Sequence, residues 1–183
     1  DSVLKDLEVQ KGEKFVVLRF VSWNASHDIG STGLSTQEKL NLVDGIKDKC
    51  KVFISSEEEL PMELWQYTLK TPVHEFHNLI YYAHAVYTEG ASVASEAVML
   101  GTHVVYVNSL SAGTTDEQSK KYDLLKYYKD HSQISESIKE FNKFIDNDDI
   151  WRTGKDKIQL IMNGKDDPNK WFYNTIVNYP NYE

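Results

Sequence analysis

Short, nearly continuous apolar runs alternate with helix-like segments along this 183-residue chain, and this alternation restricts the fold more than any other feature. Such runs are typical of strands that are covered on both faces, as in parallel sheets. The predicted strands are residues 15–21, 51–55, 85–87, 103–107 and 124–128. Strands that alternate with helices predict βαβ units with right-handed crossovers. We therefore predict an α/β fold, namely a Rossmann-like parallel sheet of about five strands flanked by helices.

Helix boundaries are marked by recognisable end signals. Ser35 followed by Glu38 predicts a capping box at the start of the first helix. Pro72 predicts that a helix begins there, because proline is favoured at the first helical position. The apolar face of that helix would consist of Val73, Phe76, Ile80 and Ala83. Gly101 is expected to end the next helix in a left-handed conformation.

The two ends of the chain differ from its middle. Residues 1–13 are charged and are expected to form a linker, and residues 165–183 are expected to form a C-terminal helix and tail. Within this tail Trp171, Phe172 and Tyr179 are predicted to pack in the core; the alternative is that they stack on nucleic-acid bases. The whole chain, 1–183, is interpreted as one domain.

Composition excludes several classes of protein. The formal net charge is -8, the isoelectric point is about 5.3, and no basic stripe of the kind that binds nucleic acid is present. No apolar run approaches the roughly 20 residues that cross a bilayer. Cys50 is the only cysteine, which favours a reducing, cytoplasmic compartment, and no metal-binding motif is present. Arg19 lies inside an apolar run, where a structural ion pair is the favoured interpretation.

Candidate ligand-binding residues follow the predicted strands, since ligands of open α/β sheets bind beyond the carboxyl ends of the strands where strand order reverses. Gly90, Ala91 and Ser92 form a small turn that opens a helix, and its first amides would hold a phosphate. Glu96 shares a helix face with Ser92 and would accept hydrogen bonds from a ribose. The alternative is that this is an ordinary strand-to-helix turn and that Glu96 is merely solvated.

The segment 86–102 resembles the turn-plus-helix motif of the C-terminal domain of GT-B glycosyltransferases and of non-hydrolysing UDP-N-acetylglucosamine 2-epimerase. Gly90-Ala91-Ser92 matches the turn, Glu96-Ala97 the Glu-Ala pair, and Leu100-Gly101-Thr102 the ending, with His103 in place of the usual proline. The resemblance implies a nucleotide diphosphate on the turn and its ribose on Glu96. A UDP-type nucleotide sugar is then the expected substrate, with no tightly bound cofactor.

A longer part of the chain resembles a prokaryotic domain-of-unknown-function family that is related to those enzymes. The matching stretches are residues 18–30, 54–57 and 88–102. This resemblance implies the nucleotide-sugar-binding half of a glycosyltransferase-like enzyme that makes surface polysaccharide or glycolipid. It also implies an N-terminal partner domain that is absent from this sequence, through which peripheral membrane contact would occur. The fragment alone is expected to bind its ligand without turnover.

His27 is the candidate catalytic acid or base, because its ordinary pKa is near 6.5 and it follows the first strand. The epimerases carry a Thr-x-His-Arg motif after this strand; Asp28, a secondary candidate, stands in place of the arginine. The alternative is that Asp28 forms a turn and His27 is exposed. The further residues predicted to line the cleft are Ser22, Asn24, Glu57, Thr88 and Glu89. Two other functions stay open: a UDP-sugar 2-epimerase-like half, and a non-catalytic binding domain.

Overall fold

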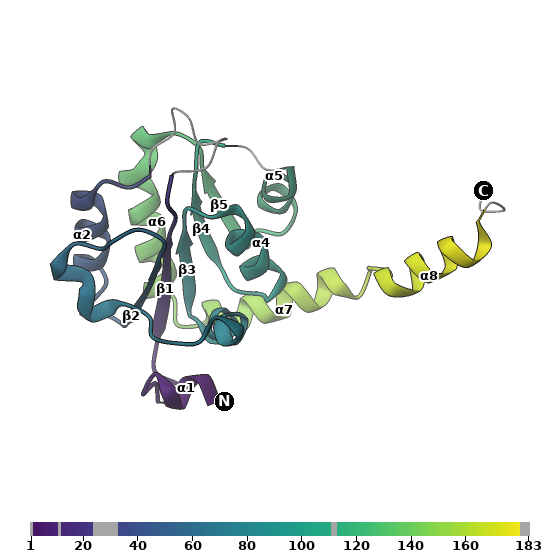
Figure 1. The fold of residues 1–183 in the computed structure, drawn as a ribbon, viewed down its shortest axis with the longest axis horizontal. Helices are drawn as coiled ribbons and strands as arrows, with labels where there is room; N and C mark the ends of the chain where they lie inside the picture. The colour runs from purple at the N-terminus through teal and green to yellow at the C-terminus, as the bar shows by residue number, and fades with distance from the viewer. Residues whose placement is uncertain (1, 11, 24–32, 111–112, 180–183) are drawn as a thin grey trace.

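A parallel sheet of five strands in the order β2-β1-β3-β4-β5 forms the centre of the domain (Figure 1). The computed structural model describes residues 2–10, 12–23, 33–110 and 113–179. The strands are β1 (Phe15–Phe20), β2 (Lys51–Ser56), β3 (Ala85–Thr88), β4 (Val104–Val107) and β5 (Leu125–Tyr128). All four strand pairings are parallel. The predicted α/β, Rossmann-like class and the five strands are therefore confirmed.

Helices cover both faces of this sheet. The α-helices are α1 (Ser2–Asp6), α2 (Thr36–Asp44), α3 (Phe76–Tyr82), α4 (Ala91–Met99), α5 (Gly113–Lys121), α6 (Ile134–Asp146), α7 (Ile150–Met162) and α8 (Pro168–Asn178). Three short 3₁₀ helices are η1 (Met62–Tyr67), η2 (Val73–Glu75) and η3 (His131–Gln133). Residues of α2 and α6 pack on one face of the sheet and residues of α3 and α4 on the other. The sheet is thus buried on both sides, as its continuous apolar runs predict.

Successive strand residues point to opposite faces, as the two-residue period of a strand requires. In β1, Val16 and Leu18 belong to the core cluster beneath α2 and α6, whereas Phe15 and Val17 belong to the cluster beneath α3 and α4. All four side chains are at most 2% exposed. One strand therefore contributes to both cores, which explains why it shows no polar alternation.

Two helix-end predictions are confirmed in detail. Ser35 accepts the backbone N–H of Glu38, and the Glu38 side chain accepts the Ser35 backbone N–H, so the capping box is complete. Gly101 has φ of +69°, the left-handed conformation that ends a helix without strain only when no Cβ is present.

The predicted helix start at Pro72 is wrong by one turn. Pro72 precedes the 3₁₀ helix η2, and the α-helical hydrogen bonds of α3 begin only at Phe76. A 3₁₀ turn has three residues instead of 3.6, so Val73 does not align with the face of α3. It is 90% exposed, whereas Ile80 is fully buried.

The segment predicted as a linker is folded. Residues 2–6 form α1, and Val3 and Val9 are buried in the core beneath α3 and α4. The Lys51 ammonium group donates to the Glu8 carbonyl, where the chain takes a positive φ of 54°. Val3 and Val9 anchor this segment to the core, although the charged residues around them suggest a linker.

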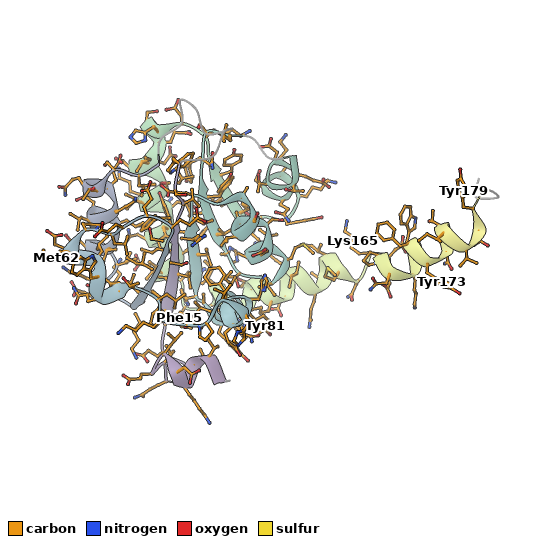
Figure 2. The ribbon with its side chains drawn as sticks, viewed as in Figure 1. Phe15, Met62, Tyr81, Lys165, Tyr173 and Tyr179 are labelled. Carbon is orange, nitrogen blue, oxygen red and sulfur yellow. The ribbon has the colours of Figure 1, made fainter. Side chains whose placement is uncertain are left out.

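The C-terminal helix α8 extends away from the sheet, as Figure 1 and Figure 2 show. Trp171, Phe172 and Tyr179 are 49%, 59% and 79% exposed, so the prediction that they pack in the core is wrong. The described residues of α8 include none that is buried. The aromatic side chains of α8 are therefore exposed on the surface of the helix.

Candidate functional site

The order of the strands places a crevice between β1 and β3. From β1 the chain goes outward to β2 and then crosses to β3 on the opposite side of β1. The segments that leave the carboxyl ends of β1 and β3 therefore diverge, which is where ligands bind in open α/β sheets. Of the predicted cleft residues, Thr88 is the last residue of β3, Glu89 follows it directly, and Ser22 lies two residues after the end of β1.

A buried carboxylate, that of Glu89, joins the two sides of this crevice. Its side chain accepts the backbone N–H of Val21 at 3.1 Å and that of Leu34 at 2.6 Å. Glu89 is fully buried, and this burial raises the pKa of its carboxyl group, an effect that the two backbone hydrogen bonds oppose. Glu89 thus fixes both ends of the segment between β1 and α2, and its carboxylate is committed to this structural contact.

Trp23 approaches the same carboxylate. A Cβ atom on Gly33 would lie 2.0 Å from Trp23 Nε1 and 2.4 Å from Glu89 Oε1, so only glycine fits there. Trp23 Nε1 is buried without a partner of hydrogen-bond geometry in the described structure, although its proximity helps to lower the pKa of Glu89. The N–H dipole of the Trp23 indole lies close enough to stabilise the charged carboxylate without a hydrogen bond.

Glu57 has a comparable structural role on the β2 side. It accepts the Ser22 backbone N–H at 3.0 Å and the Ser22 hydroxyl at 3.2 Å, and it forms an ion pair with Arg19. Arg19 also donates to the Ser55 hydroxyl at 2.8 Å. The predicted structural ion pair of Arg19 is confirmed, and Glu57 is its partner.

The turn between β3 and α4 leaves helix amides without internal partners. The Thr88 hydroxyl accepts the Gly90 N–H at 2.9 Å, and α4 has no side-chain cap because its N-cap residue is Gly90. The Gly90 carbonyl accepts the Ala94 N–H at 3.0 Å as the first α-helical hydrogen bond. The N–H groups of residues 91–93 precede it and, as in any helix, have no intrahelical acceptor. This turn can hold an anion by amide donors and the helix dipole.

Glu96 lies farther along α4 and is already engaged. Its carboxylate Oε2 is 3.3 Å from Nε2 of His77, and its side chain is 41% exposed. Ser92 is exposed one turn earlier on the same helix. A ribose on Glu96 would therefore compete with His77, a residue that the sequence pattern did not connect with the site.

The contact that Asn108 makes with this site was not predicted from the sequence. The Asn108 amide Nδ2 donates to the Glu89 carbonyl at 2.9 Å, which ties the end of β4 to the turn that begins α4. A polar residue directly after a buried strand is the available signal for such a contact. Asn108 is thus part of the support for the candidate site.

Three predicted residues, Asn24, His27 and Asp28, lie outside the described residues. Within residues 2–10, 12–23, 33–110 and 113–179, no group of histidine, cysteine or acidic side chains could hold a metal ion. In the same part of the chain, no helix has the length and apolar character needed to cross a membrane.

The fold and the crevice define the class of this protein: a Rossmann-like α/β domain with strand order 2-1-3-4-5 and an uncapped helix at the reversal of that order. No protein-family model matches the chain, and no curated protein matches it.

Proposed function

We propose that this domain is the nucleotide-sugar-binding half of a glycosyltransferase-like enzyme, and that a UDP-type donor binds at the start of α4. The observation that carries the proposal is the uncapped N-terminus of α4 beside the β1–β3 crevice. The diphosphate would accept hydrogen bonds from the amides of Ala91, Ser92 and Val93. Backbone amides at a helix N-terminus bind phosphate without needing a basic side chain.

The remaining roles follow from position along α4 and β1. Glu96 would exchange His77 for the ribose hydroxyls, which suit a carboxylate acceptor. His27 would act near the reacting sugar. The acceptor would be supplied by an N-terminal partner domain, and the product would be a surface polysaccharide or glycolipid made on the cytoplasmic side. The domain alone is expected to bind donor and to show no turnover.

A non-catalytic binding domain is the second candidate, and one observation favours it. Two cationic side chains that the structure describes beside the crevice each pair with an acidic residue: Arg19 pairs with Glu57, and Lys39 lies 3.6 Å from Glu58. Neither cation is free to neutralise a diphosphate. A domain in which only the backbone amides at the start of α4 contact the ligand would bind anions weakly and would not catalyse a reaction.

Calorimetric titration with UDP tests the proposal. The decisive variant is Ala91→Pro, because proline is tolerated at the first helical position and removes one amide donor. We expect this substitution to weaken binding by about 1–3 kcal/mol, the usual scale for a hydrogen bond to a charged group. Glu96→Ala should weaken binding by a similar amount.

His77→Ala is the matched control, since it removes the partner of Glu96 and leaves the carboxylate in place. It should leave UDP binding unchanged or strengthen it. Absence of binding of UDP and of every other nucleoside diphosphate to the folded domain would overturn the proposal.

A further inference from the structure

A cavity lies at the amino edge of the sheet, the edge opposite the β1–β3 crevice. Its volume is about 940 Å³, at the upper end of the range of small-molecule sites. Figure 2 labels Phe15 at this edge, next to α1. The apolar part of the lining consists of Leu4, Val9, Phe15, Tyr82 and Trp151. Aliphatic and aromatic side chains from α1, β1, α3 and α7 therefore meet around one space.

The outer wall of this cavity is held in place by specific contacts. Val3 is 1% exposed and anchors α1. Glu13 accepts the Gln10 backbone N–H at 2.9 Å and pairs with Lys51 at 3.0 Å, and Lys51 in turn donates to the Glu8 carbonyl. These contacts fix the chain between α1 and β1 as a rim.

The polar groups of the inner wall are already satisfied by the protein. His84 Nε2 lies 3.2 Å from the Phe144 carbonyl, and burial lowers the pKa of the His84 ring. Lys14 donates to the Ile145 carbonyl at 3.1 Å and pairs with Asp148. None of these groups requires a ligand to complete its hydrogen bonds.

Lys5 is different from the other charged residues of the lining. The two acidic residues there are paired, Asp148 with Lys14 and Glu13 with Lys51. Among the described residues no carboxylate forms an ion pair with Lys5, which is exposed on α1. The cavity thus combines an apolar interior with one unmatched positive charge at its rim.

We propose that this cavity binds an amphipathic anion: an aliphatic or aromatic body enclosed by the apolar wall, with a single acidic head group at Lys5. A fatty carboxylate and an alkyl phosphate share this chemistry. The site is independent of the nucleotide site, because the two lie at opposite edges of the sheet.

The experiment uses the full chain and the fluorescent probe 1-anilinonaphthalene-8-sulfonate, which has an aromatic body and one acidic group. We expect saturable binding at one site, with displacement by decanoate, by decyl phosphate or by both. Displacement by only one of them identifies the head group as carboxylate or phosphate. Failure of both to displace the probe, or no saturable binding, overturns the proposal.

The exposed face of α8 is the competing location for such a probe, and two indole N–H signals in ¹⁵N–¹H spectra distinguish the two sites. Trp151 lines the cavity, and its indole N–H donates to the Tyr81 carbonyl at 3.0 Å. Trp171 reports on α8. Decanoate should shift the Trp151 signal and leave that of Trp171 unchanged; the opposite result overturns the proposal.

Variants complete the test. Leu4→Trp fills the cavity and should weaken probe binding at least tenfold, whereas unchanged affinity in a folded variant overturns the proposal. Lys5→Glu should weaken it about threefold, the scale of one exposed charge. Lys139→Glu, on the exposed surface of α6, makes the same charge change elsewhere and should have no effect; an equal loss from both overturns the role of Lys5. Thermal melts confirm folding of each variant, and UDP titration should be unaffected by all of them.

Discussion

The two edges of the sheet bind opposite kinds of side chain. At the carboxyl edge the carboxylates of Glu57 and Glu89 accept backbone N–H groups of the segment after β1. At the amino edge basic side chains lie on backbone carbonyls: His84 on Phe144, and Lys155 Nζ on Leu100 at 2.7 Å. The difference follows from the topology.

In a βαβ unit each helix begins at the carboxyl edge of the sheet and ends at the amino edge. The first amides of the helices and their positive dipole ends therefore gather at one edge, and the last carbonyls at the other. Acidic side chains and bound anions are favoured where N–H groups are free, and basic side chains where carbonyls are free. This contrast is why an anion site is expected at α4, and why His84 and Lys155 lie on carbonyls at the opposite edge. Lys5 is outside this pattern, because α1 precedes the first strand and is not the helix of a βαβ unit.

Glu89→Ala is the substitution at the carboxyl edge that should lower the free energy of unfolding most. It leaves the N–H groups of Val21 and Leu34 without their acceptor in a buried place, and each orphaned donor costs about 1–3 kcal/mol. Because the raised pKa shows that burying this carboxylate is itself unfavourable, we expect a net loss of about 2–4 kcal/mol in the free energy of unfolding. Urea denaturation measures it.

Glu59→Ala is the control for that experiment, since Glu59 follows β2 on the same edge and is exposed. Its free energy of unfolding should stay within about 0.5 kcal/mol of the parent value. Equal effects of the two substitutions would contradict the structural role of Glu89.

Gly154→Ala should destabilise the protein at the amino edge of the sheet by a different mechanism, namely steric overlap. A Cβ on Gly154 would lie 2.2 Å from the Gly101 carbonyl oxygen, so α7 has to move away from the end of α4. Overpacking of this kind costs about 1–3 kcal/mol. Gly164→Ala is the control because nothing lies within 4 Å of its Cβ. It should leave the thermal midpoint unchanged or raise it; a comparable loss from both would refute the close approach.

The sequence predicts those parts of the fold that depend on local, repeated signals. The five strands follow from apolar runs, the start of α2 from Ser35 and Glu38, and the end of α4 from Gly101. Each of these signals acts over a few residues, so no knowledge of the tertiary structure is required. The alternation of strands and helices also predicts that ligands bind at the carboxyl edge of the sheet. The position of the crevice between β1 and β3 depends on the strand order, which these local signals do not give.

The parts of the fold and of the candidate site that the sequence does not predict depend on contacts between residues that are distant in sequence. Helix α5 has no apolar stripe; the residues that it buries are the polar Thr115 and Gln118, so hydrophobic periodicity does not reveal it. Glu89 was predicted as a cleft residue, but its contacts are 55 and 68 residues away in sequence. The aromatic residues of α8 look like core residues because composition does not show what they contact.

The pH dependence of stability should have opposite signs at the two edges. Burial lowers the pKa of His103 to about 4, so in the folded state it binds its proton less readily than when unfolded. Its contribution is present above pH 6.5 and is lost as the pH falls toward 4. Glu89 has a raised pKa, so the stability that its protonated form contributes is present at low pH. This contribution is lost as the pH rises through the pKa of Glu89 in the folded state.

His103→Phe isolates the amino-edge contribution, and the new ring can keep the edge contact with Phe144. Between pH 7 and pH 5 the parent should lose about 1–2 kcal/mol of stability through His103, and the variant should lack this loss. Denaturant midpoints at both pH values give the comparison. Parallel pH profiles of parent and variant would show that His103 does not titrate in this window.

Arg19→Lys should have the smallest effect, and it tests whether the carboxyl edge depends on geometry as well as charge. Arg19 binds Ser55 and Glu57 with two different nitrogens, which a single ammonium group cannot reproduce at both positions. Its side chain is 21% exposed, so we expect a loss of about 0.5–1 kcal/mol. Arg152→Lys is the matched control: Arg152 is 69% exposed, pairs with Asp149 within α7, and should show no measurable change. If the two substitutions have equal effects, Arg19 contributes only as a surface charge, and the segment after β1 is held at that end by Glu57 alone.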